Sequence, residues 1–265
     1  MEQNQFQSSS GWRDGSFSDR QDDLDRFYGQ GKAWILWDDK EAWRLRGEIE
    51  GDFYSRLLSK HNISSVIDIS AASGFHVISL ARAGFITAAI DGFEGFVSAG
   101  RRNVEDAQLE IIFQHARWSD LASLAARIGT FDAAVCLGSS LHHTDQSGVG
   151  DLFRDIGCVL NPGAKFIVEQ RNYERLFSER PESIDHPCGW RYALEYPAHR
   201  TVIFHLKDQA RGLDTSTLTT ITFENEMLQI AHAQGYSLRD TYYDYGKHSD
   251  RAQSWWIQYV FERII

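Results

Sequence analysis

Apolar and polar positions follow two rhythms along this chain: short apolar runs, and longer stretches in which apolar residues recur every three or four positions. Buried strands produce the first pattern and amphipathic helices the second. Residues 66–91, "VIDISAASGFHVISLARAGFITAAID", show both in succession, with a turn of small residues between them and Asp91 at the end. They predict one βαβ unit, with its strand, helix and strand over 64–70, 74–84 and 85–91.

The same alternation continues on both sides of this unit. Upstream, apolar residues at helical spacing predict one amphipathic helix over 40–60. Downstream we expect helices over 95–107, 120–128 and 148–160, and strands over 109–116, 131–140 and 165–172. Strands that alternate with helices form a mainly parallel, doubly wound α/β sheet, whose ligands bind at the carboxyl ends of the strands.

The rhythm changes after the fifth predicted strand. Residues 191–209 and 212–224 alternate with period two, which is the pattern of antiparallel strands with one exposed face. A helix followed by a strand is then predicted over 224–245, and a last strand over 254–264. The complete sheet should therefore have seven strands, with an antiparallel insertion after strand five.

Length and composition fit one elaborated domain. The chain has 265 residues, of which 42% are apolar and 24% charged, close to globular averages. We expect a single domain over 26–265, in which 178–222 form a substrate-side antiparallel insertion. Residues 1–25 are polar and acidic and are predicted to form a flexible arm.

Composition also narrows the partners. No apolar run approaches the roughly 20 residues of a membrane helix, and the polar start is unlike a secretory signal. Cys136, Cys158 and Cys188 are few and far apart, which favours a cytoplasmic protein without a metal site. A net charge of -10 without a basic cluster argues against a nucleic-acid partner and favours a small-molecule substrate. The many aromatic residues fit either ordinary packing or a pocket for a flat or cationic ligand.

The turn after the first strand suits a nucleoside cofactor. Asp68 ends the strand, and small residues such as Ala72 and Gly74 let backbone N–H groups approach a ligand. Asp91 follows about twenty residues later, where a carboxylate can accept both hydroxyls of a ribose. Asp91 followed by Gly92 also fits the cap of the next helix, and the two roles can coexist.

The loop lacks the glycines of the dinucleotide fingerprint, which disfavours a pyrophosphate. S-adenosyl-L-methionine carries no phosphate, so its site tolerates a looser turn and needs partners for a carboxylate and an amine instead. Ala72 stands where a glycine is expected. Because an alanine fits such a turn most easily with a negative φ, we predict that Ala72 has one.

Four segments resemble a known family. "DISAASG" (68–74) resembles the "D-V-A-C-G-T-G" loop of class I S-adenosylmethionine-dependent methyltransferases. "CLGSSLHH" (136–143) and "QRNYERLF" (170–177) resemble "CLGNSFAH" and "HRNYDYIL" of its glycine N-methyltransferase and glycine/sarcosine N-methyltransferase branch. "AWILWDDKEAWRLR" (33–46) resembles that branch's "VWQLYIGDTRSR". The resemblance, strongest over 28–177, implies a Rossmann-like sheet and methyl transfer to a small amine.

The resemblance also implies a cofactor-binding set. Its members would be Trp34, Arg46, Asp68, Ala72, Gly74, Asp91, Gly92, Arg117, Trp118, Leu137, Gly138 and His143. Arg46 matches an arginine that binds the carboxylate of the cofactor, although a helix ion pair with Glu50 at i+4 is an alternative. Trp118 would adjoin the adenine or simply pack in the core.

The substrate side is implied by the same motifs. Arg171 would hold an amino-acid carboxylate, with an ion pair to Glu169 or Glu174 as the alternative. Ser139 replaces an asparagine of the family, and His143 matches its histidine and would line the site, whereas His142 is expected at the surface. Tyr28, Arg171 and His143 form the predicted catalytic set, and Ser139, Arg171, Tyr173 and Tyr242 the substrate-binding set. Candidate pocket walls are Tyr173, Tyr192, Tyr196, Tyr242, Tyr243 and Tyr245.

Methyl transfer from a sulfonium needs alignment and desolvation more than a strong acid or base. We therefore expect an N-methyltransferase acting on a small amine, most simply an amino acid such as glycine or sarcosine. Two alternatives stay open: a small-molecule methyltransferase with an O-, C- or larger N-acceptor, and a non-catalytic cofactor-binding protein. The glycine branch assembles into tetramers, so a homo-oligomer also stays open.

Overall fold

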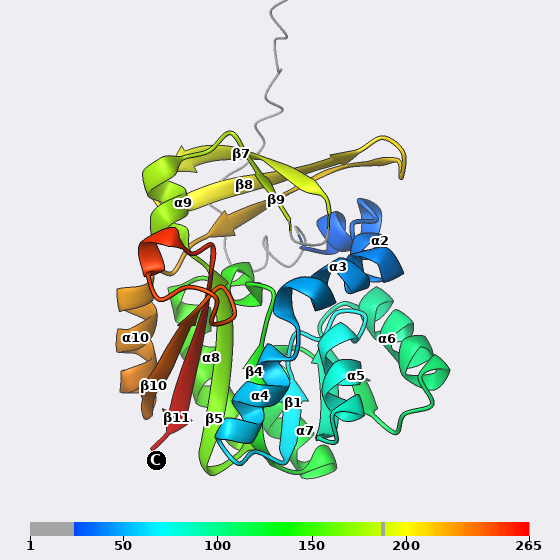
Figure 1. Cartoon of the computed structure of the whole chain (residues 1–265), viewed down its shortest axis with the longest axis vertical. Helices are drawn as coiled ribbons and strands as arrows, with labels where there is room; N and C mark the ends of the chain where they lie inside the picture. Colours follow the sequence, from blue (N-terminus) through cyan, green and yellow to red (C-terminus); the bar gives the residue numbers. More distant parts are fainter. Residues whose placement is uncertain (1–23, 187–188, 265) are drawn as a thin grey trace, which may run out of the picture.

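The structure is a computed structural model that describes residues 24–186 and 189–264. Its main sheet has seven strands in the order β10-β11-β5-β4-β1-β2-β3 (Figure 1). The strands are β1 (Ser65–Asp68), β2 (Ile86–Asp91), β3 (Ile112–His115), β4 (Phe131–Cys136), β5 (Leu160–Arg171), β10 (Tyr236–Tyr243) and β11 (Trp256–Arg263). Strands β1 to β5 are mutually parallel, and β11 runs antiparallel to both of its neighbours. The predicted doubly wound α/β sheet with seven strands is therefore confirmed.

Helices cover both faces of this sheet. The α-helices are α2 (Trp34–Trp37), α3 (Lys40–Glu50), α4 (Phe53–Lys60), α5 (Phe75–Arg82), α6 (Glu94–Asp106), α7 (Leu121–Ile128), α8 (Gln146–Ile156), α9 (Tyr173–Glu179) and α10 (Glu224–Ala233). Short helical turns are η1 (Asp25–Gln30), η2 (Trp118–Asp120), η3 (Ser140–His143), η4 (Gly157–Val159) and η5 (Arg251–Gln253). Helices α7, α8 and α10 share one core with the sheet, while α4, α5 and α6 pack on the opposite face.

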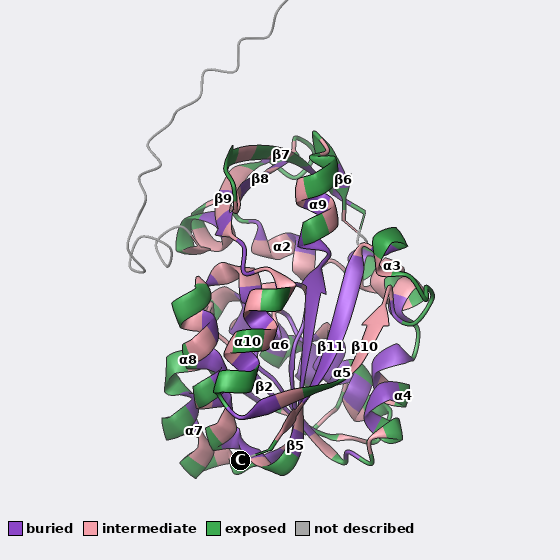
Figure 2. Cartoon of the chain, turned by 90° about the vertical axis from the view of Figure 1, so that its left-hand side faces the viewer, coloured by how far each residue is buried: buried purple, intermediate pink, exposed green. Residues whose placement is uncertain are grey.

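The strands are apolar on both faces because each face is covered. Successive residues of a strand point to opposite sides, so Phe166 and Val168 of β5 join the core under α8, and Ile167 joins the core under α4. Figure 2 shows β11 buried over most of its length, and the carboxyl half of β5 is buried as well. This explains why the sequence showed continuous apolar runs rather than alternation over β1, β2 and β4.

The single helix predicted over 40–60 is wrong. Gly51, with φ of 57°, ends α3, and α4 starts at Phe53. A positive φ is inexpensive for glycine and cannot continue a right-handed helix. The break lets α3 turn away from the face of the sheet that α4 covers, so the last turn of α3 carries Arg46 and Glu50 toward the end of β5.

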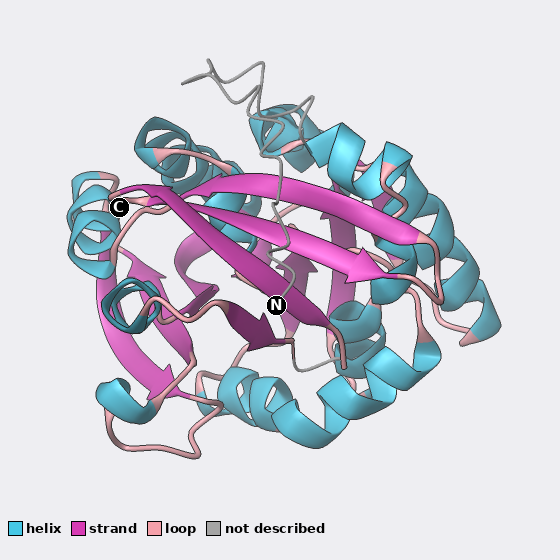
Figure 3. Cartoon of the chain, turned by 90° about the horizontal axis from the view of Figure 1, so that it is seen from above, coloured by secondary structure: helices cyan, strands magenta, loops and turns pink. Residues whose placement is uncertain are grey.

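A second, antiparallel sheet of four strands follows β5, in the order β6-β7-β8-β9. Its strands are β6 (Ser183–Asp185), β7 (Arg191–Ala198), β8 (Thr201–Asp208) and β9 (Leu213–Thr220). Seen from above in Figure 3, these strands cross over the main sheet, and Figure 1 places them above its carboxyl ends. Residues of η1, α2 and α9 share one apolar cluster with this sheet, which we call the roof sheet.

The predictions about membrane helices, cysteines and the N-terminal arm can be compared with the described residues only. Within the described residues, no helix has the length and apolar character needed to cross a membrane. Cys136 is buried and Cys158 exposed, and neither is in a disulfide. Cys188 and most of the predicted flexible arm lie outside the described residues.

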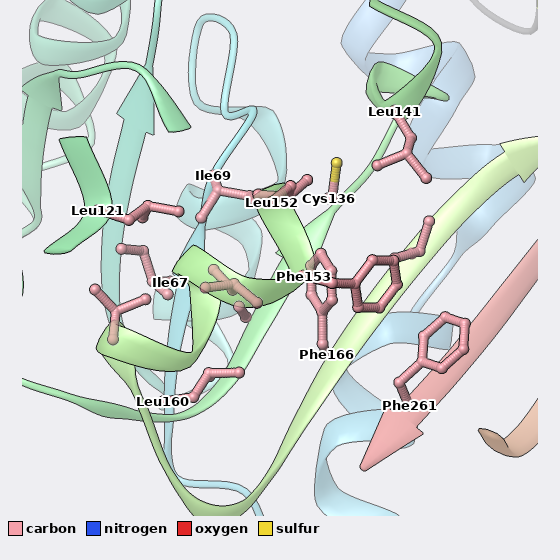
Figure 4. Close-up of a cluster of buried hydrophobic side chains, with 14 of the residues drawn as sticks. Ile67, Ile69, Leu121, Cys136, Leu141, Leu152, Phe153, Leu160, Phe166 and Phe261 are labelled. Atoms are coloured by element: carbon pink, nitrogen blue, oxygen red, sulfur yellow. The ribbon is translucent and has the colours of Figure 1, made fainter. Parts of the chain in front are cut away.

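The core under α8 gives a direct test of the fold. The ring of Phe153 contacts Phe166, Tyr236 and Phe261 at centroid distances of 5.2, 5.4 and 5.2 Å (Figure 4). We expect Phe153→Ala to lower the free energy of unfolding by about 3–5 kcal/mol, because it removes a fully buried ring and leaves a cavity. Urea unfolding followed by circular dichroism measures the change. Ile112→Ala, at a side chain that is 48% exposed, is the control and should change it by less than about 0.5 kcal/mol.

Candidate active site

A cavity of about 440 Å³ lies between the carboxyl ends of β1, β2, β4 and β5 and the roof sheet. The loops after β1, β2, β3 and β4 and the last residue of β5, Arg171, contribute to its wall, as do η1 and α3 from the amino-terminal side and β7, β8 and β9 from the roof. Such a position is where doubly wound sheets bind ligands, because the loops there diverge to neighbouring helices. The volume falls within the range of small-molecule sites.

Most predicted site residues meet at this cavity. Those that line it are Tyr28, Arg46, Ala72, Asp91, Gly92, Arg117, Trp118, Leu137, Gly138, Ser139, His143 and Arg171. They come from segments up to 143 residues apart, between Tyr28 and Arg171, so the fold and not the local sequence brings them together. Their individual roles stay predictions.

Five predicted residues do not line the cavity. Trp34 lies on α2, but Trp37 at the end of that helix is the tryptophan that reaches the wall. Asp68, at the end of β1, and Gly74, in the loop after it, are buried beneath the wall, and Tyr173 lies behind Ser139. Tyr242 sits on β10, where its hydroxyl accepts a hydrogen bond from Lys60 at 2.7 Å.

The predicted negative φ of Ala72 is wrong. Ala72 has φ of 46°, in the left-handed region that glycine favours. Its N–H donates to Asp91 Oδ2 at 2.9 Å, so the strained backbone ties the loop after β1 to the end of β2. The next glycine, Gly74, has φ of 98° and starts α5. A Cβ added there would lie 3.3 Å from the ring of Phe113, which explains why glycine stands at that position.

Asp91 is already held by the backbone on both oxygens. Oδ2 accepts from Ala72, and Oδ1 accepts from the Phe93 N–H at 2.9 Å, ahead of α6. Burial nevertheless raises the pKa of Asp91 to about 6, because these bonds compensate only part of the lost hydration. Each oxygen keeps a free lone pair, so the carboxylate can still accept hydroxyls from the cavity.

Arg46 forms the ion pair with Glu50 that the sequence offered as the alternative, and its role toward the cofactor stays a prediction. Its Nε donates to Glu50 one turn later on α3, and its Nη2 lies 3.5 Å from Glu169 Oε1 at the end of β5. His76 Nε2 lies 2.9 Å from Glu50 Oε2. Burial alone would raise the pKa of Glu50, but Arg46 and His76 outweigh it and lower that pKa to about 2. Arg46 also lines the cavity beside Gly138, so its two ion pairs hold in place a guanidinium that still faces the cavity.

The turn after β4 exposes backbone to the cavity. Gly138 and Ser139 have φ of 69° and 64°, and the Gly138 N–H donates to Glu169 Oε1 at 3.0 Å. Ser139 Oγ accepts from the Arg171 N–H at 3.1 Å and lies 2.9 Å from the Tyr173 hydroxyl. The small hydroxyl therefore connects the turn after β4 to the end of β5 and to α9.

The expectation that His142 lies at the surface is wrong. His142 is half-buried and lines the cavity, with its ring stacked on Phe204 of the roof sheet at 5.9 Å and its Nδ1 2.6 Å from the Tyr173 hydroxyl. The turn of η3 brings the ring centroids of His142 and His143 to within 4.3 Å of each other. His143 Nε2 lies 3.1 Å from the Tyr28 hydroxyl. Burial lowers the pKa of His143 to about 4, so its ring is neutral at pH 7.

Arg171 is a buried cation that has no acidic partner among the described residues. It is 6% exposed, its guanidinium lies over the ring of Trp256 at 4.5 Å, and burial lowers its pKa. Among the described residues, no carboxylate forms an ion pair with it, which excludes the pairing with Glu169 or Glu174 there. Glu169 is directed to Arg46 and Gly138, and Glu174 pairs with Arg251.

Sequence reasoning missed part of the wall. Tyr192 is the one candidate tyrosine of the insertion that lines the cavity, and it is joined there by His186, Phe204 and Thr217. Trp256, from β11, pairs in register with Arg171 of β5. No local signal marks Phe204, Thr217 or Trp256, because alternating strand residues look the same whether they face a cavity or a core.

The polar groups of the cavity fit the cofactor expected from the sequence. Arg46 can bind the methionine carboxylate, Asp91 can accept the ribose hydroxyls, and the turn at Gly138 offers backbone to the amino-acid end. Trp118 is fixed by its Nε1, which donates to the Ile69 carbonyl at 2.8 Å, and flanks the cavity near Arg117. The described residues hold no group of three or more His, Cys, Asp or Glu that could bind a metal.

Comparison with known proteins gives one family model, described as a methyltransferase domain, that matches residues 66–163. A glycine/sarcosine N-methyltransferase of Parasynechococcus marenigrum is 33% identical over 141 residues, covering 53% of this chain and 49% of that relative. Another from Aphanothece halophytica is 28% identical, covering 67% of this chain and 74% of the relative. The chain thus spans about half the length of the first relative and about three-quarters of the second.

Solved structures show the same fold. An S-adenosylmethionine-dependent methyltransferase from Clostridium acetobutylicum superposes with a TM-score of 0.66 at 14% identity, covering 93% of this chain and 98% of the other. The amino pentose methyltransferase CalS10 from Micromonospora echinaspora, determined with S-adenosylmethionine bound, gives a TM-score of 0.58 at 14% identity, with 84% and 95% covered.

Ala72→Gly tests the strained loop. A left-handed alanine costs roughly 1–2 kcal/mol, whereas the added chain entropy of glycine costs about 0.5–1 kcal/mol, so we expect unchanged or slightly higher stability. Affinity for S-adenosylhomocysteine, measured by calorimetric titration, should stay equal or become slightly tighter. Weaker binding would contradict the role of this loop as a cradle for the cofactor.

The raised pKa of Asp91 predicts that protein stability and cofactor affinity change with pH in opposite directions. Because its pKa rises from 3.8 to about 6 on folding, the folded state holds the proton more tightly, and the stability of the ligand-free protein should fall as pH rises through that window. Affinity for S-adenosylhomocysteine should instead increase about tenfold from pH 5 to 7.5, because the ionised carboxylate is the better acceptor. Thermal melts and calorimetry at each pH measure both. Asp91→Asn should bind more weakly and lose both dependences, and a variant that keeps them would assign the titration to another group.

Proposed function

We propose that this chain, an S-adenosyl-L-methionine-dependent methyltransferase, methylates the amine of a small amino acid such as glycine or sarcosine. The observation that carries the proposal is Arg171, a buried guanidinium in the wall of the cavity that forms no ion pair among the described residues. The names of the relatives at 26 to 33% identity, glycine and glycine/sarcosine N-methyltransferase, support it.

An unpaired buried cation is costly, and it is maintained where a ligand supplies the counter-charge. A carboxylate can bind a guanidinium through two parallel hydrogen bonds, which fixes both the position and the rotation of the bound molecule. Trp256 holds the flat face of Arg171, so the fork of N–H donors is oriented before a ligand arrives. An amino acid bound in this way would have its amine at a fixed distance from Arg171.

The cofactor end would be held by other residues. Arg46 would bind the carboxylate of the cofactor, and Asp91 the ribose, with Arg117 and Trp118 beside the adenine. When bound, S-adenosyl-L-methionine supplies a methyl group on a sulfonium that is already a good leaving group. The protein then has to align the amine with this methyl group and exclude water, and the roof sheet provides that enclosure.

Neutral polar and aromatic groups surround the part of the cavity between the proposed acceptor site at Arg171 and the proposed cofactor site at Arg46. Tyr28 and His143 are hydrogen-bonded to each other, and burial raises the pKa of Tyr28, so both are uncharged at pH 7. Uncharged oxygen and ring atoms suit a positive charge that disperses during the transfer. We include Tyr28 and His143 in the proposed catalytic site for this reason, together with Ser139 and Arg171 at the acceptor end.

Replacing Arg171 tests the proposed function. We expect Arg171→Gln to raise KM for the amino acid that accepts the methyl group about 10- to 100-fold, because a charged hydrogen bond is worth about 1.5–3 kcal/mol. Affinity for S-adenosylhomocysteine should change little. Arg56→Ala, at an arginine whose side chain is 65% exposed, is the matched control and should leave KM unchanged. An unchanged KM in Arg171→Gln would remove the carboxylate anchor from the proposal.

The acceptor itself is found with labelled cofactor and mass spectrometry. The panel should contain glycine, sarcosine and alanine, the corresponding amines without a carboxylate, and phenols as O-acceptors. Transfer to the amino acids alone supports the proposal. Transfer to amines or phenols alone would contradict it and would assign the chain to another acceptor class.

A further inference from the structure

A chain of hydrogen bonds runs from the end of β5 to a histidine in the cavity wall. The backbone N–H of Arg171 donates to Ser139 Oγ at 3.1 Å. Ser139 Oγ lies 2.9 Å from the Tyr173 hydroxyl, and that hydroxyl lies 2.6 Å from His142 Nδ1. Ser139 and Tyr173 are 2% exposed. The chain therefore fixes the rotation of the His142 ring from a buried, rigid side.

The other edge of the His142 ring is left for a ligand. His142 lines the cavity, and within the described residues its Nε2 has no hydrogen-bond partner. Phe204 of the roof sheet lies nearly parallel to the ring, with an interplanar angle of 18° and ring centroids 5.9 Å apart. Thr217 of the same sheet lines the cavity too, and its buried hydroxyl also has no partner among the described residues. This end of the cavity thus offers polar groups that the described residues leave without a hydrogen-bond partner.

The sequence marks the same place as a departure from the related family. In "CLGSSLHH", Ser139 stands at the asparagine of "CLGNSFAH", and His142 stands at its alanine. The two exchanged positions are joined in space through Tyr173. This chain thus has a histidine, His142, in the cavity wall and lacks the amide that the family has at position 139. The polar groups beside the proposed acceptor therefore differ from those of the family.

We propose that His142 is the base that removes the proton from the acceptor before methyl transfer, and that Ser139 and Tyr173 position its ring. For the amine acceptor, this inference rests on the proposed function. An amino acid is an ammonium near neutral pH, and its nitrogen has no lone pair until one proton leaves. Nε2 of His142 is the neutral acceptor that the cavity wall provides for that proton.

The step balances without a further reactant. One N–H bond of the acceptor ammonium breaks, and the proton forms a bond to His142 Nε2. The nitrogen lone pair then forms the N–C bond while the C–S bond of the methyl donor breaks, with its electron pair going to sulfur. The product nitrogen carries the positive charge that the sulfonium lost, and His142 returns its proton to solvent after release.

The hydrogen-bond chain permits this assignment. If Nδ1–H donates to Tyr173 and the Tyr173 hydroxyl donates to Ser139, Nε2 keeps a free lone pair toward the cavity. Ser139 Oγ can accept from both Tyr173 and the Arg171 N–H, because it has two lone pairs. Protonation of Nε2 then leaves every bond of the chain intact.

The surroundings keep His142 neutral in the ligand-free protein. Burial lowers its pKa well below the usual value, and the neighbouring His143 and Arg171 lower it further. Tyr173 contacts it from α9, and β8 contributes Phe204, which does not titrate. A substrate carboxylate on Arg171 would cancel part of that positive charge, so binding the acceptor should itself make His142 a stronger base.

The test is the pH profile of His142→Gln, which keeps a polar side chain but cannot titrate. At pH 7 we expect kcat for the amino acids of the acceptor panel to fall about 100-fold or more, while KM changes little because Arg171 still holds the carboxylate. The loss should shrink about tenfold per pH unit toward pH 9, where solvent supplies the free amine. Tyr173→Phe, which removes the anchor but keeps the base, should show a smaller loss with a shifted profile. His232→Gln, at an exposed histidine on α10, is the control and should behave like the unchanged protein.

A second measurement needs no turnover. The ring of His142 is assigned in nuclear magnetic resonance spectra by comparison with His142→Gln, and its titration is followed with and without sodium acetate. We expect acetate to raise its pKa, and no change would overturn the coupling to Arg171. A pH profile of His142→Gln parallel to that of the unchanged protein would overturn the base while leaving the proposed function intact. Transfer to phenols alone, again with a loss in His142→Gln that recovers with pH, would remove the amino-acid acceptor and support the base.

Discussion

The buried carboxylate of Glu169 organises the whole site. It is completely inaccessible to solvent near the end of β5, where Oε1 accepts from the Gly138 N–H and faces Arg46, and Oε2 accepts from Tyr54 and Gln258. One side chain thus connects β5 to the turn after β4, to α3 and α4, and to β11. A buried charge with this many partners is stable only if all of them stay in place, so it makes the site rigid.

The same carboxylate explains why Arg171 forms no ion pair within the part of the chain that the structure describes. Glu169 and Arg171 are two residues apart on β5 and point to the same face of the sheet, so an ion pair between them was a reasonable expectation from sequence. The structure directs Glu169 to Arg46 instead and leaves Arg171 over Trp256. Arg46 therefore has a carboxylate partner on β5 and Arg171 does not, because Glu169 is directed to Arg46. The spacing of these residues in the sequence does not reveal this choice.

The fold was predictable to the extent that its signals were local. The strand and helix periods and the acid at Asp91 located the sheet, the loop after β1 and the edge where ligands bind. Three features depended on contacts between distant residues and were missed or mistaken. Ala72 takes a positive φ because its N–H is directed to Asp91, 19 residues away. His142 turns inward because Tyr173 and Phe204 hold it, and Phe204 itself lies on a strand whose alternation did not show which face meets the cavity.

The distribution of charge along the cavity separates its two ends. At the proposed cofactor end, the guanidinium of Arg46 meets the carboxylates of Glu50 and Glu169, and the ring of His76 also contacts Glu50. S-adenosyl-L-methionine carries one carboxylate against an amine and a sulfonium, so carboxylates at this end suit the positive groups of the cofactor. At the proposed acceptor end, Arg171 has no carboxylate beside it among the described residues, and the neighbouring rings of His142 and His186 are kept neutral by burial and by Arg171. An acceptor with a carboxylate neutralises this end, whereas an acceptor that is only a cation would add a second positive charge to it. The proposed preference for amino acids over simple amines therefore follows from electrostatics as well as from hydrogen-bond geometry.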